Sequence, residues 1–152
     1  MNTIPEAEAR ALLARPQECV DCPDWSGWKL LAGSVQTSMG LVDADGMGTR
    51  MQVVLRFHRS AKTKITHHLL TVFKMEPYGL ERVYQLDVKQ FPRPVKDAHQ
   101  KPHEHWGALR ALGAAPWATW SYEQVLAHFS QQTNIIFLPQ PKHPEAFELK
   151  RQ

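Results

Sequence analysis

The segment Arg82–Trp106, RVYQLDVKQFPRPVKDAHQKPHEHW, combines three histidines with acidic and basic side chains directly after an apolar strand pattern. A buried histidine needs hydrogen-bond partners, and ionisable groups that lie close together shift one another's pKa values. Groups with shifted pKa values are frequent where a protein performs chemistry. The segment is therefore the candidate site of the chain.

These residue types suit cleavage of a phosphodiester bond in RNA without a metal ion. A base must take the proton of the 2′-OH, an acid must protonate the leaving oxygen, and a cation must offset charge on the phosphorane-like transition state. His103 and His105 are predicted to act as acid and base, and His99 belongs to the same group of histidines. Asp87 is predicted to orient an imidazole, and Arg82 to supply the cation.

Two other interpretations of this segment stay open. His-x-His on a strand presents two imidazoles to one point, so His103 and His105 could bind a metal ion, with His99 and either Asp87 or Glu104 completing the set. The protein would then be a metal-dependent hydrolase. In the other interpretation the histidines only satisfy local hydrogen bonds. Histidines that are adjacent on a strand or isolated are expected to be structural: His67, His68, His128 and His143.

Basic residues gather on or beside the preceding strand pattern, which favours a polyanionic partner. The formal net charge is only +3, so the distribution of the charges matters more than their total. An aromatic side chain after the histidines is expected to stack on an exposed base. The residues predicted to bind nucleic acid are Arg56, Arg59, Lys62, Lys64, Lys101 and Trp106. Without catalysis, the basic strand would form a binding module for nucleic acid or for an acidic protein.

Length and composition indicate one domain. A chain of 152 residues, 43% of them hydrophobic, can bury one good core and has no room for two ordinary domains. We predict a single domain over residues 1–138 and a flexible, polar, proline-rich tail over residues 139–152. No apolar run approaches the roughly 20 residues of a membrane-spanning helix. The first residues lack the pattern of a secretory signal, so the expected location is the cytoplasm. No cofactor is expected.

Three patterns rich in β-branched and aromatic residues predict consecutive antiparallel strands over 51–59, 65–75 and 80–88. In the third pattern, alternation places Asp87 on the face away from the core and Arg82 on the side of Tyr84.

Shorter elements are predicted around these strands. A first strand is predicted over Trp28–Val35, between a loop over 17–27 and a glycine-rich turn over 40–48. His103–Trp106 is predicted to return as a short strand with both histidines on one side, and Ile135–Leu138 to form a last strand.

Capping patterns predict a helix near each end of the chain. The spacing Thr3-Ile-Pro-Glu6 precedes the strong helix formers of 7–14, and Ser121-Tyr-Glu-Gln124 precedes apolar residues at helical spacing up to Phe129. The predicted fold class is α+β, an antiparallel meander sheet with an N-terminal and a C-terminal helix packed on one face.

The two cysteines form one pair, Cys19-Val-Asp-Cys22, which could be a redox pair, half of a zinc site, or neither. A redox pair normally lies between a strand and a helix, whereas the flanking Pro16 and Pro23 predict a loop. Two reduced thiols are the expectation.

The Arg-x-x-x-x-Asp strand followed by Pro-His-x-His resembles a loose group of small bacterial proteins, at least one branch of which is assigned as the toxin of a toxin–antitoxin pair. The likeness spans residues 50–136, including the Pro116-Trp-Ala118 segment and the final amphipathic helix. The matching residues are Arg82, Asp87, Pro102, His103 and His105. This resemblance implies a toxin-like endoribonuclease that acts on RNA and has a small antitoxin protein as partner.

Overall fold

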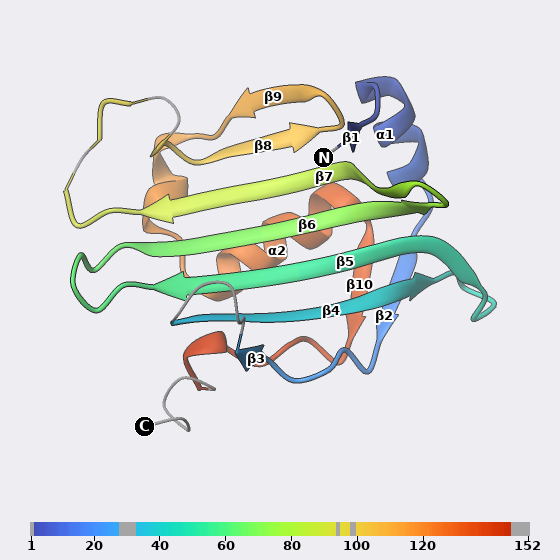
Figure 1. The fold of residues 1–152 in the computed structure, drawn as a ribbon, viewed down its shortest axis with the longest axis horizontal. Coiled ribbons are helices and arrows are strands. Elements are labelled where there is room, and N and C mark those ends of the chain that lie inside the picture. The colour runs from blue at the N-terminus through green and yellow to red at the C-terminus, as the bar shows by residue number, and fades with distance from the viewer. Residues whose placement is uncertain (1, 28–32, 94, 98–99, 147–152) are drawn as a thin grey trace.

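The structure, a computed structural model, describes residues 2–27, 33–93, 95–97 and 100–146. The strands are β1 (Asn2–Thr3), β2 (Gln17–Val20), β3 (Ser26–Gly27), β4 (Ser34–Val42), β5 (Gly48–Arg59), β6 (Thr66–Glu76), β7 (Gly79–Gln90), β8 (His103–Trp106), β9 (Leu109–Leu112) and β10 (Ile135–Leu138). The helices are α1 (Glu6–Leu13), the short 3-10 helix η2 (Ala115–Thr119) and α2 (Tyr122–Thr133). These strands form one sheet in the order β10-β2-β4-β5-β6-β7-β8-β9, with β1 added to β7 and β3 to β4 (Figure 1).

The long strands β4 to β7 are successive antiparallel neighbours, which confirms the three predicted strands and their order. Alternate residues of β5, namely Val53, Leu55 and Phe57, are buried in the core. Helix α2 lies across this face of the sheet (Figure 1), and Phe129 of α2 packs against Tyr84 of β7 with 5.8 Å between ring centroids. We call the opposite face of the sheet the open face.

The coarse fold class, α+β, is confirmed, but the sheet is mixed rather than purely antiparallel. β10 runs parallel to β2, and β1 runs parallel to β7. The predicted loop over 17–27 is wrong, because β2 and β3 lie within it. In β2 the buried Gln17 and Cys19 alternate with more exposed residues, so a short strand pattern was present among loop-forming residue types.

Both predicted helices form, and their N-termini differ from one another. Ser121 and Gln124 make both hydrogen bonds of the predicted capping box of α2. At α1 the predicted capping box is absent: Pro5 is the N-cap residue without a side-chain hydrogen bond, and Thr3 pairs with Arg82 as part of β1. α1 lies at the end of the sheet beside β1 (Figure 1), not across its face like α2.

Three further predictions concern the strand over 28–35, the turn over 40–48 and the tail. Residues 34 and 35 begin β4, whereas residues 28–32 lie outside the described residues. The strand continues through residue 42, so the turn is shorter than predicted.

Residues 139–146, part of the predicted tail, contact the domain: Trp25 Nε1 donates a hydrogen bond to the carbonyl of Lys142 at 2.7 Å, and Arg59 forms an ion pair with Glu145 at 2.8 Å.

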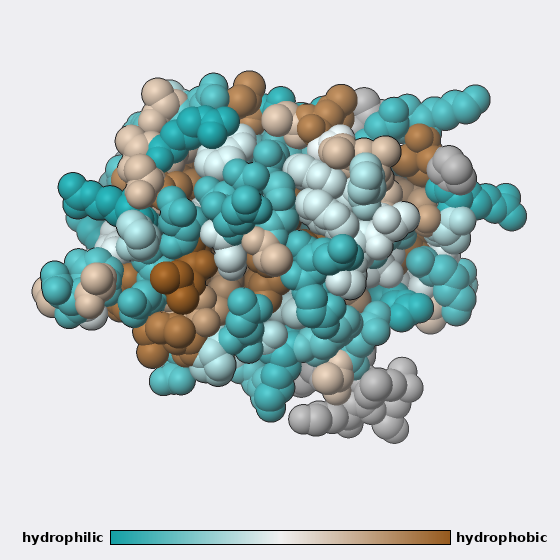
Figure 2. Space-filling model, turned by 180° about the vertical axis from the view of Figure 1, so that it is seen from behind, coloured by the Kyte–Doolittle hydropathy of each residue, from teal (hydrophilic) through white to brown (hydrophobic). Residues whose placement is uncertain are grey.

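The surface on the α2 side is largely hydrophilic, with one larger hydrophobic patch at the lower left of the view and smaller hydrophobic groups along its upper edge (Figure 2). Within the described residues, no helix is long and apolar enough to cross a membrane. β10, an edge strand of the sheet, exposes Ile136 and Leu138 by about half.

Candidate functional site

Five polar side chains, one from each of the adjacent strands β4 to β8, form a row across the open face. We call this set the histidine row; it consists of Ser34, His58, His67, Asp87 and His103. Hydrogen bonds and ion pairs join its members at each end, and cross-strand pairing joins the two halves in the middle.

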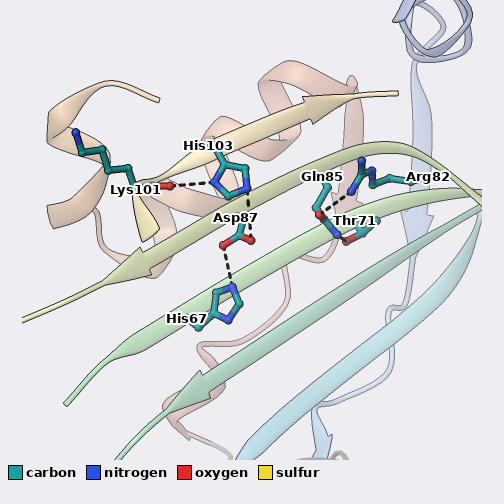
Figure 3. A network of polar contacts seen from close by, with 7 residues as sticks. All are labelled: His67, Thr71, Arg82, Gln85, Asp87, Lys101 and His103. Atoms are coloured by element: carbon teal, nitrogen blue, oxygen red, sulfur yellow. Dashed lines mark hydrogen bonds and ion pairs between the residues drawn. The ribbon is translucent and has the colours of Figure 1, made fainter. Parts of the chain in front are cut away.

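Asp87 links two imidazoles (Figure 3). Its Oδ1 lies 2.9 Å from Nε2 of His67, and its Oδ2 lies 3.7 Å from Nε2 of His103. Nδ1 of His103 lies 2.9 Å from the carbonyl oxygen of Lys101. Because a carbonyl oxygen only accepts, Nδ1 carries a hydrogen atom and donates a hydrogen bond to it. The side chain of His67 is 25% exposed, that of Asp87 18% and that of His103 9%. His67 is therefore the imidazole of this group that a ligand on the open face reaches most readily.

His58 and His67 are directly opposite each other on β5 and β6. Opposed residues of an antiparallel pair point to the same face, with Cβ atoms about 4.5–5.5 Å apart. Nδ1 of His58 lies 3.1 Å from the hydroxyl oxygen of Ser34 on β4. Each of the two histidines is thus held by a different polar partner, and the two rings are neighbours on one surface.

Arg82 lies on the open face, contrary to the prediction from alternation. The pairing of β6 with β7 shifts by one residue, from Val72 opposite Tyr84 to Phe73 opposite Arg82. A bulge of this kind inserts one extra residue in one strand and reverses the alternation beyond it. Nη1 of Arg82 donates a hydrogen bond of 3.3 Å to Oε1 of Gln85 (Figure 3).

Arg82, Gln85 and Thr71 form a second hydrogen-bonded group beside the histidine row. Nε2 of Gln85 donates to Oγ1 of Thr71 at 3.0 Å. Nε of Arg82 is buried and has no hydrogen-bond partner among the described residues, and burial lowers the pKa of its guanidinium. An unpaired buried donor favours a bound acceptor, since leaving it unsatisfied costs roughly 1–3 kcal/mol.

His105 lies on the same side of β8 as His103, as predicted, with 5.0 Å between the ring centroids. Burial, followed by the positive charges of Arg82, His103 and Arg110, lowers the pKa of His105 to about 4. At neutral pH its imidazole is therefore uncharged. Its Nδ1 is buried without a hydrogen-bond partner among the described residues. His105 is thus a poor general acid at pH 7, which weighs against its predicted role.

The carboxyl group of Asp87 stays ionised at neutral pH. Burial raises its pKa, but the hydrogen bond from His67 and the charges of His67, His103 and Lys89 outweigh burial, and the net pKa is lowered. An ionised carboxylate only accepts hydrogen bonds. Asp87 therefore accepts a hydrogen bond from the Nε2–H of His67, as expected of a residue that orients an imidazole.

The predicted nucleic-acid-binding residues do not form one surface. Arg56 lies on the open face, where its Nε donates to Oε1 of Gln36 at 3.2 Å. Arg59 is three residues further along β5 and therefore faces the other side, where it pairs with Glu145. Lys62 and Lys64 are exposed in the turn between β5 and β6.

Two other members of the predicted set lie at β8 and just before it. The Lys101 side chain is exposed, while its carbonyl accepts from His103. The prediction that Trp106 stacks on an exposed base is wrong. Its side chain is 6% exposed and lies on the α2 side of the sheet. The ring of Tyr84 is 4.8 Å from its ring, and the guanidinium of Arg10 is 4.1 Å above it. Both contacts occupy its ring, so Trp106 is unsuited to stacking on a base.

The alternative of a His-x-His metal site loses one of its predicted ligands. Glu104 points to the α2 side, where its Oε2 accepts from the hydroxyl of Tyr84 at 2.6 Å and lies 3.1 Å from Nε2 of His128. His99 lies outside the described residues. Within the described residues, no three side chains of His, Cys, Asp or Glu are placed to hold a metal ion together.

Sequence reasoning missed His58 and His67 as site residues, although a signal for both was present. The hairpin between β5 and β6 is closed by a hydrogen bond from Ser60 N–H to the Ile65 carbonyl. Counting outward from this turn places residue 58 opposite residue 67. Alternation with the apolar Phe57 then assigns His58 to the open face.

Comparisons with models of protein families, with curated proteins and with solved structures found no match for this chain. The functional argument therefore rests on the site, and the toxin resemblance stays a prediction.

Proposed function

We propose that this protein is a metal-independent endoribonuclease that cleaves RNA by histidine acid–base chemistry on the open face of its sheet. The observation that carries the proposal is the placement of His58 and His67 as cross-strand neighbours, each held by its own polar partner. Cleavage through the 2′-OH needs a base and an acid on opposite sides of one phosphate. His58 and His67, which are opposite each other on neighbouring strands, provide such a pair.

His67 is assigned as the general base. Because Nε2 donates its proton to the ionised Asp87, the lone pair of the neutral ring is on Nδ1. When the ring takes up the 2′-OH proton, the carboxylate stabilises the imidazolium that results. His58, which contacts the hydroxyl of Ser34, is assigned as the acid that protonates the leaving oxygen. His103, whose Nε2 lies 3.7 Å from the second oxygen of Asp87, is assigned as a positioning residue.

Charge on the open face fits a phosphodiester. Among the described strand residues of β5 to β9, pairing puts four cations on this face beside one carboxylate, that of Asp87; the cations are Arg56, Arg82, Lys89 and Arg110. Cations near the scissile phosphate offset the charge of the transition state, and those further away hold the backbone of the RNA.

The test is cleavage of a short RNA by the purified protein in the presence of a chelator. The wild type should yield 2′,3′-cyclic phosphate ends and leave the matching DNA intact, because DNA lacks the attacking 2′-OH. His67→Gln keeps a hydrogen-bond donor toward Asp87 but cannot exchange a proton, so cleavage should fall by roughly 10²–10⁴-fold. RNA affinity should change little.

The matched control is His143→Gln, since His143 lies against Tyr122 on the other side of the sheet. This variant should cleave RNA like the wild type. A wild type that does not cleave RNA, or a His67→Gln protein as active as the His143→Gln control, would show that the proposed chemistry is wrong.

The toxin assignment, with a small antitoxin protein as partner, rests on the resemblance of Arg82, Asp87 and the Pro102-His-x-His105 segment. We propose it as the biological setting of the cleavage. Induced expression of the wild type should then arrest bacterial growth and fragment cellular RNA, while His67→Gln should be harmless at equal abundance. Unimpaired growth with active wild-type protein would overturn the toxin role and leave the nuclease activity standing.

A second candidate is a binding module that holds RNA without cleaving it. It is favoured by a shallow hollow of the open face, away from the histidines, lined in part by Gln36, Gln52 and Arg56. Amide and guanidinium groups suit hydrogen bonding to bases and phosphates. For a module, Arg56→Ala should weaken RNA binding in a salt-dependent way, and no variant of His67 should matter.

A further inference from the structure

Cys19 and Cys22 lie where β2 ends, one strand beyond β4 in the sheet order. Cys19 is fully buried in β2, opposite Phe137 of β10. Cys22 follows two residues after the strand and is partly exposed. Both are free thiols, and they are the only cysteines of the chain.

The backbone turns sharply between the two cysteines. Asp21 has a φ of 54°, in the left-handed region, and its N–H donates to the carbonyl of Leu138 at 2.9 Å. A residue in this conformation reverses the chain locally. As a result Cys22 folds back beside the strand, where its Sγ lies 3.4 Å from Oγ1 of Thr37 on β4.

The two thiols are unequal. Their mutual hydrogen bond is the largest cause in both: it lowers the pKa of Cys22 to about 7 and, with burial, raises that of Cys19 well above its ordinary value. The sulfur of Cys22, the less buried of the two residues, is thus the one that ionises near neutral pH. Thiolates, not thiols, attack disulfides, so reactivity and access coincide at Cys22.

We propose that Cys19 and Cys22 form a redox-active dithiol, in which Cys22 attacks a small disulfide and Cys19 resolves the adduct to an intramolecular disulfide. In the first step the Cys22 thiolate bonds to one sulfur of the small disulfide, whose S–S bond breaks and releases a thiolate. In the second step Cys19 attacks Sγ of Cys22, and the second small thiol leaves with the proton of Cys19. The protein loses two electrons and two protons, and one small disulfide becomes two thiols.

Formation of the adduct also prepares the second step. While Cys22 is ionised, its charge and its hydrogen bond are two of the three causes that keep Cys19 protonated. Both vanish when Cys22 becomes a mixed disulfide, and only burial continues to raise the pKa of Cys19. Cys19 is therefore held unreactive until there is an adduct to resolve. This inference is independent of the proposed RNA chemistry.

The experiment is reaction of the folded full-length protein with oxidised glutathione, quenched with acid at intervals and followed by mass spectrometry. The wild type should lose both free thiols, form no disulfide-linked dimer, and end two hydrogen masses lighter without an adduct. Its initial rate should rise with pH through an inflection at about 7. The same chain unfolded in urea should show an inflection near the ordinary thiol value of 9.0.

Two serine variants separate the roles. Cys19→Ser should stop at a stable glutathione adduct on Cys22, whereas Cys22→Ser should leave the buried Cys19 unmodified. A wild type that accumulates the adduct or a covalent dimer would overturn the proposal, and so would a Cys22→Ser protein that reacts as fast as the wild type. If a variant fails to fold, the pH profile of the wild type decides, because an inflection near 9 would overturn the assignment of Cys22.

Discussion

Replacing His68 by leucine should remove much of the acid sensitivity of folding. His68 follows His67 on β6 but faces α2, where it is 3% exposed and its ring lies 5.2 Å from that of Phe57. Burial is the largest cause that lowers the pKa of His68 to about 4, followed by the charges of His67 and His143, while a hydrogen bond with Gln90 acts in the opposite direction.

The sign and size of the effect follow from linkage. The unfolded chain binds a proton at His68 with the ordinary pKa of 6.5 and the folded protein with a pKa of about 4. Acid therefore favours the unfolded chain: the contribution to stability is complete above pH 6.5 and is lost as the pH falls toward 4. One such group lowers the free energy of unfolding by about 2 kcal/mol between pH 7.5 and pH 5, and by about 3 kcal/mol in full.

The assay is urea denaturation followed by circular dichroism at pH 7.5 and at pH 5, for the wild type and for His68→Leu. The absolute stability of the variant is not decisive, because leucine also loses the contact with Gln90. The decisive quantity is the change between the two pH values, which should be about 2 kcal/mol smaller in the variant. His105, whose pKa is also lowered to about 4, is present in both proteins and cancels. Equal pH dependence in the two proteins would refute the reasoning that burial keeps His68 neutral.

Two further variants probe the orientation of the histidines and the C-terminal helix. Asp87→Asn should lower RNA cleavage about 10²-fold, because an amide cannot stabilise the protonated His67; RNA binding measured at constant salt should be unchanged, and wild-type cleavage by this variant would contradict the assigned role. Ser121→Ala removes the acceptor of the Gln124 N–H and should lower the free energy of unfolding by about 1 kcal/mol; a loss below a few tenths in urea denaturation would mean that water replaces the cap.

Local patterns were sufficient for most of the secondary structure. The three β-rich patterns became β5, β6 and β7, and the Ser121 capping box became the start of α2, because hydrophobic period and capping chemistry act within a few residues. Elements with weak local signals were missed. β2 is four residues long and is stabilised by its partners β4 and β10, which lie far away in the sequence.

The candidate site was predicted in part. The open-face position of Asp87 and the shared side of His103 and His105 follow from alternation, and the structure confirms both. Arg82 was assigned to the wrong face because one extra residue in β7 reverses the alternation. His67 is predicted to be structural because the adjacent His67 and His68 point to opposite faces of a strand; this local pattern gives no sign of the Asp87 carboxylate, which comes from the next strand.

The sequence by itself determined the three strands β5, β6 and β7 and the apolar side of most of their length, because both depend on spacing along a single segment. The tertiary structure alone decided which polar side chains meet. The histidine row joins five strands through pairing registers, and each register depends on turn geometry, bulges and the packing of the opposite face against α2. A shift of one residue in any register would move a member of the row to the other face of the sheet. Chemistry at this site is therefore a property of the strand pairing, whereas the strands themselves are a property of the sequence.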